Sequence, residues 1–162
     1  MIQPTGIEHA DGLFHALDFD SVYQFISQPR PRNPEEVRAR IERINAGPNP
    51  DSRQEWLNFV VLLDSEVIGR LEATLIGESA VIAYLFNPLV SGKGYATTGI
   101  LWLIDHIFKT REVNEIWATT DPANLKSINL LKRCAFKEAA LPAQGLLSFD
   151  AGDAVFQLRR IG

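Results

Sequence analysis

A single stretch of the chain decides the fold: SAVIAYLFNPLVSGKGYA, residues 79–96. Its first eight residues, Ser79 to Phe86, have the apolar character of a buried strand, and Asn87-Pro88 ends that strand. Gly92-Lys93-Gly94 then lies between this strand and a long helix that starts at Tyr95. The backbone must turn sharply there and approach a ligand closely, which residues without a β-carbon allow at low cost.

The loop Ser91-Gly92-Lys93-Gly94-Tyr95-Ala96 is a candidate binding site for a phosphate group. The helix that follows it presents free N–H groups and the positive end of its dipole, and Lys93 adds a positive charge. An ordinary strand-to-helix turn, in which the glycines only ease the bend, is the alternative. The spacing differs from a P-loop and from a dinucleotide fingerprint, which needs a third glycine where Thr97 stands. Kinase-like and dehydrogenase chemistry are therefore not supported.

The segments around this stretch predict a mixed sheet. Before it, strand-like sequence runs from Trp56 to Leu63 and from Val67 to Ile76, with short turns between, which predicts a three-stranded antiparallel meander. After it, a helix over Tyr95 to Lys109 and a strand over Val113 to Thr120 predict a right-handed crossover to a parallel strand. The other expected elements are helices over Gly6–Leu17 and Asp18–Ser27, one that begins at Asn33-Pro34 and ends at Gly47-Pro48, a last helix from Asp121 or Asn124, and closing strands over Phe136–Leu141 and Ala154–Ile161.

Length and composition indicate one domain, residues 1–162, because 162 residues with 46% hydrophobic side chains can bury one core and are too few for two full-sized domains. The 16 basic and 20 acidic residues give no basic surplus, so we expect no nucleic-acid partner. No stretch has the length of a membrane span or the pattern of a signal peptide, so we expect a cytoplasmic protein without a membrane partner. One cysteine, Cys134, and scattered histidines predict no disulfide and no metal site.

Four motifs follow one another along the chain: the strand from Ala80 to Pro88, the loop from Gly92 to Thr97, Asn124-Leu125-Lys126-Ser127, and Ala135-Phe136. In this order and spacing they resemble the GNAT superfamily of N-acetyltransferases. The similarity is closest to the branch typified by the ribosomal-protein N-terminal acetyltransferases (RimJ/RimL type). This resemblance implies an α/β fold with a splayed, mostly antiparallel sheet of about six to seven strands flanked by helices.

The resemblance also implies where acetyl-CoA, the co-substrate, would bind. Its acetyl-pantetheine arm would lie in the opening between the strand Ser79–Phe86 and the strand Val113–Thr120, where backbone groups pair with its amides and polarise the thioester carbonyl. The backbone amides of Ser91 to Ala96 would hold the pyrophosphate. The residues expected to bind the cofactor are Tyr84, Leu85, Phe86, Ser91, Gly92, Lys93, Gly94, Tyr95, Ala96, Asn124 and Ser127.

The reaction needs a neutral amine, a polarised thioester and a proton for the departing thiolate. We expect direct attack of the amine in a ternary complex, with no acetylated enzyme residue. Many GNAT enzymes carry a proton-donating Tyr where this chain has Leu131, so Ser127 is the substitute donor, or else a cofactor contact that transfers no proton. The general base is open: Glu72 is the first candidate, and the others are Glu55, Glu78, His15 and water.

The acceptor is a primary amine, either a protein N-terminus or a small molecule, and the sequence does not distinguish them. The N-terminal helices and the loop Ala143 to Gly152 would form its groove. The absence of the helix Tyr and of a carboxylate near Val81 motivates a second hypothesis, a CoA-binding sensor or interaction module with the same fold and little turnover. A homodimer is also open.

Overall fold

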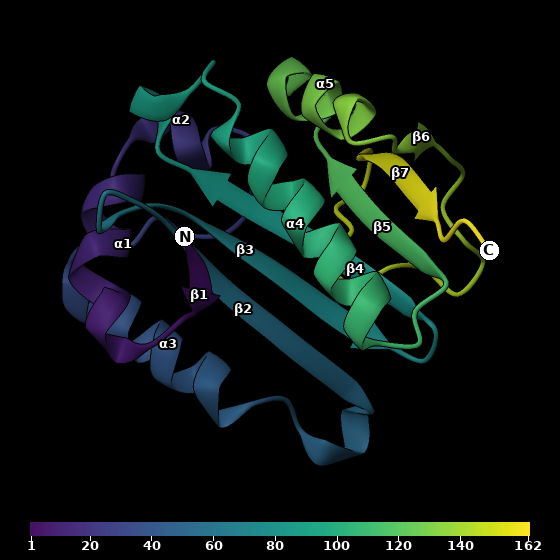
Figure 1. Ribbon diagram of the computed structural model, residues 1–162, viewed down its shortest axis with the longest axis horizontal. Helices are drawn as coiled ribbons and strands as arrows, with labels where there is room; N and C mark the ends of the chain where they lie inside the picture. The colour runs from purple at the N-terminus through teal and green to yellow at the C-terminus, as the bar shows by residue number, and fades with distance from the viewer.

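The computed structural model describes residues 1–162 as one seven-stranded sheet with helices on both faces (Figure 1). The strands stand in the order β1-β2-β3-β4-β5-β7-β6, and all neighbours are antiparallel except β4 and β5. The predicted mixed, mostly antiparallel sheet is therefore confirmed. The strands are β1 (Ile2–Pro4), β2 (Gln54–Leu63), β3 (Glu66–Ile76), β4 (Ser79–Phe86), β5 (Glu115–Thr120), β6 (Lys137–Glu138) and β7 (Ala154–Arg159).

The helices cover the two faces of the sheet separately. Helices α1 and α3 share one apolar cluster with Val60 of β2, and helices α4 and α5 share the larger cluster on the opposite face. No helix is both long and apolar enough to cross a membrane. The helices are η1 (Ile7–His9), α1 (Ala10–Leu17), α2 (Asp20–Tyr23), α3 (Pro34–Ala46), η2 (Pro50–Ser52), η3 (Pro88–Val90), α4 (Tyr95–Thr110) and α5 (Leu125–Arg133).

Local sequence signals fix the ends of α3 as expected. The side chain of Asn33 accepts a hydrogen bond from the backbone N–H of Glu36 at 3.0 Å, which satisfies one of the free donors of the first turn. Pro34 occupies the first turn, and Gly47 ends the helix with a φ of 84°. Val37 and Ile41 are buried in the apolar cluster below, whereas other residues of the helix reach solvent.

Tight turns produce the predicted meander of β2, β3 and β4. Asp64 and Ser65 both have positive φ values, 50° and 68°, the combination that matches the twist of the two strands they join. The register shifts by one residue beyond the turn, because Val67 pairs with Leu62 while Gly69 pairs with Val61. Ile68, between Val67 and Gly69, is therefore the extra residue of a β-bulge.

The structure adds one strand and changes the ends of several predicted elements; the helix expected over Asp18–Ser27, for example, is reduced to α2. Strand β1 was not predicted; its three residues pair with Phe59–Val61, and a segment this short carries no readable pattern. The closing strand expected over Phe136–Leu141 is reduced to Lys137–Glu138, with one further backbone bond from Ala139 N–H to the carbonyl of Val155. The strand predicted over Val113–Thr120 begins two residues later, at Glu115.

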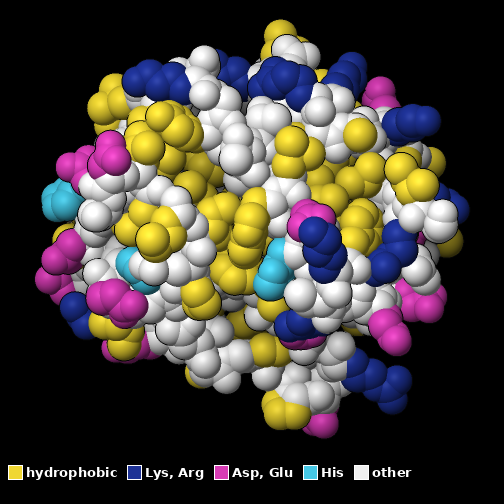
Figure 2. Space-filling view, in the orientation of Figure 1, with side chains coloured by type: hydrophobic (Ala, Val, Ile, Leu, Met, Phe, Trp, Pro, Cys, Tyr) yellow, Lys and Arg dark blue, Asp and Glu magenta, His cyan; other side chains and the backbone are white.

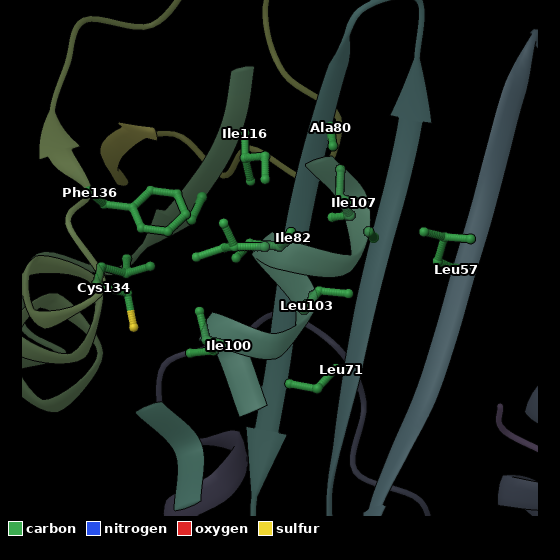
Figure 3. Packing of buried hydrophobic residues seen from close by; sticks show 14 of the residues in the cluster. Leu57, Leu71, Ala80, Ile82, Ile100, Leu103, Ile107, Ile116, Cys134 and Phe136 are labelled. Carbon is green, nitrogen blue, oxygen red and sulfur yellow. The ribbon is translucent and has the colours of Figure 1, made fainter. Parts of the chain in front are cut away.

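Helix α4 lies at the centre of the larger core (Figure 3). Ile100, Leu103 and Ile107 recur at three- and four-residue steps and are fully buried. Figure 3 shows their side chains directed toward residues of the sheet that include Ile82 and Ile116. Burial of each such side chain stabilises the fold by about 1.5–3 kcal/mol, so the packing of α4 fixes where its first turn lies.

Close packing at Gly69 predicts a strong effect of a single methyl group. A β-carbon there would lie 2.5 Å from Cδ1 of Phe86, its partner across β3 and β4, and 2.8 Å from the carbonyl oxygen of Leu85. We expect Gly69→Ala to lower the free energy of unfolding by about 1–3 kcal/mol in denaturant titration. Gly99→Ala is the control: its β-carbon would stand 3.2 Å from Phe86 Cζ, and the gain in helix propensity of about 1 kcal/mol opposes that contact. Equal stability of the two variants would contradict this packing.

Candidate active site

The sheet opens between β4 and β5. The two strands pair in parallel only where Ser79–Val81 meets Glu115–Trp117. Beyond these pairs β4 stays bonded to β3 as far as Phe86, and β5 stays bonded to β7 as far as Thr120. Figure 1 shows the carboxyl ends of β4 and β5 apart at the upper edge, with the first turns of α4 between them. The opening expected between these strands is present.

A cleft of about 440 Å³ lies at this opening. Segments that are distant in the sequence form it: the carboxyl halves of both strands, the start of α5, the middle of β3, the segment after α2 and the loop before β7. Its lining residues are Val22, Phe25, Ile26, Ser27, Gln28, Arg70, Glu72, Thr74, Val81, Ile82, Ala83, Tyr84, Leu85, Thr119, Thr120, Asp121, Asn124, Ser127, Ser148, Asp150 and Asp153.

The lining residues come from both faces of the sheet. Ile82 and Tyr84 belong to the core on the side of α4 and α5. Ala83, between them, points to the opposite face and lies directly across from Glu72 of β3. The cleft is therefore accessible to groups on both faces of the sheet.

On the α4 and α5 side, the hydroxyl groups of Tyr84 and Ser127 are 2.6 Å apart and form a hydrogen bond. The bond joins β4 to α5 across the opening, since α5 follows β5 in the chain. Burial raises the pKa of Tyr84 to about 12, so this phenol is protonated at neutral pH. The sequence analysis assigned Tyr84 a backbone contact with the cofactor. The structure adds that its side-chain hydroxyl also takes part in the site.

Asn124 is the N-cap of α5. Its side-chain oxygen accepts a hydrogen bond from the backbone N–H of Ser127 at 3.2 Å. The structure thus brings Asn124 and Ser127 together and gives the side-chain oxygen of Asn124 a structural partner. Its side-chain N–H₂ group makes no hydrogen bond within the protein.

The glycine loop lies beyond the cleft, at the N-terminus of α4. Gly92 and Gly94 have φ values of 81° and 83°, and added β-carbons would meet nothing within 4 Å, so backbone conformation rather than space requires glycine here. Gly94 is the N-cap and supplies no side chain to the first turn, and the residues from Ser91 to Gly94 are exposed. The first N–H groups of α4 are therefore open to an anion.

Positive charge gathers near this loop. Figure 2 shows Lys and Arg side chains along the upper edge of the molecule, where Figure 1 places α5 and the start of α4. Such an edge favours a ligand that carries phosphate groups.

The residues expected to bind the cofactor fall into two groups. Tyr84, Leu85, Asn124 and Ser127 line the cleft. Phe86 and the loop Ser91, Gly92, Lys93, Gly94, Tyr95 and Ala96 do not line it, and the side chain of Phe86 packs against the core. An extended ligand that reaches both groups would have to run from the cleft to the N-terminus of α4.

On the other face, Glu72 forms ion pairs with two arginines. Nη2 of Arg40 lies 2.5 Å and Nε of Arg70 lies 3.5 Å from the same oxygen, Oε1. Arg70 also donates to the side-chain oxygen of Gln28 at 3.0 Å, and its burial lowers its pKa. The second oxygen of Glu72, Oε2, takes part in neither ion pair, so it is the one free to meet another group in the cleft.

The other candidate bases lie elsewhere. Glu55 is bound by Arg111, whose hydrogen bonds lower the pKa of that carboxyl, and it does not line the cleft. Neither Glu78 nor His15 lines the cleft either. Of the four side chains considered as base, the structure places only Glu72 there.

Three carboxylates on the rim were not singled out from the sequence. Asp121, Asp150 and Asp153 line the cleft. Burial raises the pKa of Asp153, as do the charges of the other two, and a hydrogen bond from the backbone N–H of Asp150 opposes this rise. They come from loops without a readable pattern, although Asp150 belongs to the loop expected to form the acceptor groove. No group of three or more His, Cys, Asp or Glu side chains is arranged to hold a metal ion.

Comparison with known proteins identifies the class. The model of the acetyltransferase (GNAT) domain family matches residues 1–137. The chain therefore belongs to the GNAT acetyltransferase family, as its motifs indicated, and it is an N-acetyltransferase by class.

Similar proteins agree with this class. The chain is 27% identical over 138 residues to an uncharacterized N-acetyltransferase, p20, of Bacillus licheniformis, across 83% of this chain and 77% of that protein. Its fold is similar to that of RimL, a ribosomal L7/L12 alpha-N-protein acetyltransferase in complex with coenzyme A, with a TM-score of 0.78, 16% identity and coverage of 98% and 92%. It is similar to that of the aminoglycoside acetyltransferase AAC(6')-Ib in complex with coenzyme A, with a TM-score of 0.77, 18% identity and coverage of 99% and 94%.

The capping role of Asn124 predicts how two substitutions differ. Asn124→Ala removes the acceptor for the Ser127 N–H and should lower the free energy of unfolding by about 1 kcal/mol, measured in denaturant without ligand. Asn124→Asp keeps a capping oxygen and should retain most of the stability. If both variants match the parent protein, Asn124 does not stabilise α5.

Proposed function

We propose that this chain transfers the acetyl group of acetyl-CoA to a primary amine by direct attack in a ternary complex. The observation that supports this most is the opening of the sheet, because it leaves the carboxyl half of β4 without a neighbour on one side. Backbone groups at Tyr84, Leu85 and Phe86 would pair with the pantetheine amides, and an N–H there would polarise the thioester carbonyl. The pyrophosphate would rest on the N–H groups of Ser91 to Ala96.

The protein supplies orientation and proton transfer. The amine attacks the thioester carbonyl carbon and loses one proton, and the thiolate of CoA departs and gains one, so the reaction balances. Glu72 would accept the amine proton through Oε2, with water as the alternative base, and Ser127 would direct a proton to the sulfur. An acetylated cysteine is disfavoured, because Cys134 is 2% exposed and burial raises the pKa of its thiol.

The acceptor would enter on the face of Glu72, between the segment Val22–Gln28 and the loop that carries Asp150. RimL is named for a protein substrate and AAC(6')-Ib for aminoglycosides, and the fold resembles both to nearly the same degree. The acceptor in this proposal is thus a protein N-terminus or a small-molecule amine. A free α-amino group, with a pKa of about 7.7–8.0, needs less help from a base than a lysine does.

The central experiment measures release of free thiol from acetyl-CoA over a panel of amines that includes peptides, amino acids, polyamines and aminoglycosides. We expect release with at least one acceptor. Binding of acetyl-CoA without release for any acceptor would favour the second hypothesis, a CoA-binding sensor, for which the missing Tyr at Leu131 is the motivating observation.

The loop proposal predicts a matched pair of glycine variants. Gly94→Ala forces a β-carbon onto a φ of 83°, displaces the N–H groups of α4 and should weaken acetyl-CoA binding roughly tenfold in calorimetry. Gly77→Ala strains a hairpin turn with a φ of 58° at the opposite end of β4 and should leave affinity unchanged. Equal affinities of the two variants would contradict a pyrophosphate site at the loop.

The role of Glu72 is tested against another arginine-paired glutamate. Glu72→Gln should lower kcat/KM roughly 100-fold near pH 7, with recovery at higher pH as more of the amine is already neutral. Glu55→Gln removes a carboxylate bound to Arg111 outside the cleft and should leave kcat/KM unchanged. A full rate in Glu72→Gln would assign the base role to water.

A further inference from the structure

The relative acidity of the two hydroxyl groups decides which of them donates in the hydrogen bond between Tyr84 and Ser127. Either oxygen can be the donor in the 2.6 Å contact. A phenol is a far stronger acid than an aliphatic alcohol, so in the neutral pair the Tyr84 O–H donates and Ser127 Oγ accepts. The O–H of Ser127 itself is then free to point elsewhere, and both residues line the cleft.

The position of the Tyr84 hydroxyl is fixed by packing. The ring is half-buried against the larger core, and Ile82, two residues before it on the same face of β4, is buried in that core. The backbone N–H of Ser127 is held by Asn124. A serine hydroxyl otherwise rotates freely, so the bond from Tyr84 restricts the one torsion that packing and the cap leave open.

We propose that Tyr84 is a positioning residue of the active site: its phenol donates to Ser127 Oγ, directs the Ser127 O–H into the cleft, and stabilises the partial negative charge that Oγ carries while its proton passes to the departing thiolate. This inference rests on the proposed function, in which Ser127 serves the sulfur. It gives β4 a second part in the reaction, through a side chain rather than through its backbone.

Tyr84 does not itself supply the proton that ends on CoA. Its O–H is directed at Ser127 Oγ, 2.6 Å away, so in this arrangement the O–H of Ser127 faces the thiolate. Ser127 replaces the proton that it gives to sulfur with one from water, while the proton that the amine loses passes to Glu72, or to water where water is the base, and from there to solvent. Tyr84 keeps its O–H bond throughout, as a positioning role requires.

Tyr84→Phe removes the hydroxyl and keeps the ring that packs in the core. We expect kcat to fall roughly tenfold while KM for acetyl-CoA stays within about twofold, because the cofactor contacts of the β4 backbone remain. Thr110→Val is the control: it also removes a hydrogen-bonded hydroxyl, one that donates to the carbonyl of His106 at the C-terminal end of α4, outside the cleft, and its kinetics should be unchanged. An unchanged kcat in Tyr84→Phe overturns the proposal.

The double variant separates positioning from an independent role. In a Ser127→Ala background, Tyr84→Phe should produce no further loss of kcat, because the group that Tyr84 positions is already absent. The same tenfold loss in both backgrounds would show that Tyr84 acts without Ser127 and would overturn the inference.

The parent protein, the two single variants and the double variant can also be unfolded in denaturant without substrates. This measurement tests the hydrogen bond between Tyr84 and Ser127 by itself. A non-zero coupling between the two substitutions in the free energy of unfolding is expected if the hydrogen bond forms in solution, and zero coupling overturns the proposal. Coupling in stability with no effect on kcat means that the bond is only structural and also overturns it. If the parent protein turns over no amine, the proposed function fails together with this role, whereas turnover that Tyr84→Phe leaves unchanged contradicts only the role of Tyr84.

Discussion

Strands β4 and β5 are held together by three parallel residue pairs and then separate. A strand that leaves its neighbour exposes backbone N–H and C=O groups, which favours either water or a ligand with complementary amides. The separation is tolerated because each strand keeps an antiparallel partner on its other side, β3 for β4 and β7 for β5. The cleft depends on this opening. So do the contact between Tyr84 and Ser127 on one face of the sheet and the access to Glu72 on the other face.

Helix α4 connects the core to the phosphate loop. Ile100, Leu103 and Ile107 bury the helix against the sheet, and the helix begins one residue after Gly94. The apolar periodicity of α4 therefore also aims its free N–H groups at the upper edge, where Figure 2 shows basic side chains. Gly99 allows the close approach of α4 to Phe86 at the end of β4, so the same contact holds the loop beside the opening.

The parts of the molecule that could be predicted from sequence are those with local signals. The cap at Asn33 and the turn at Asp64 and Ser65 were readable because a few adjacent residues determine them. The hydrogen bond between Tyr84 and Ser127 joins residues 43 apart, and the ion pair of Arg40 with Glu72 spans 32, so no local pattern encodes either contact. Strand β1 is missed for a related reason: it exists only because β2 offers an edge.

The two faces of the opening suit direct transfer between two substrates. Tyr84 and Ser127 lie toward α4 and α5, whereas Ala83 and Glu72 share the opposite face. In direct attack, the amine that loses a proton and the sulfur that gains one stand on different sides of the carbonyl carbon, so the groups that serve them should also lie apart.

A covalent acetyl-enzyme would instead need one nucleophile that meets both substrates in turn. Cys134, the single thiol, is buried at the end of α5 and cannot meet either without a rearrangement of the core, which favours the ternary complex on geometric grounds.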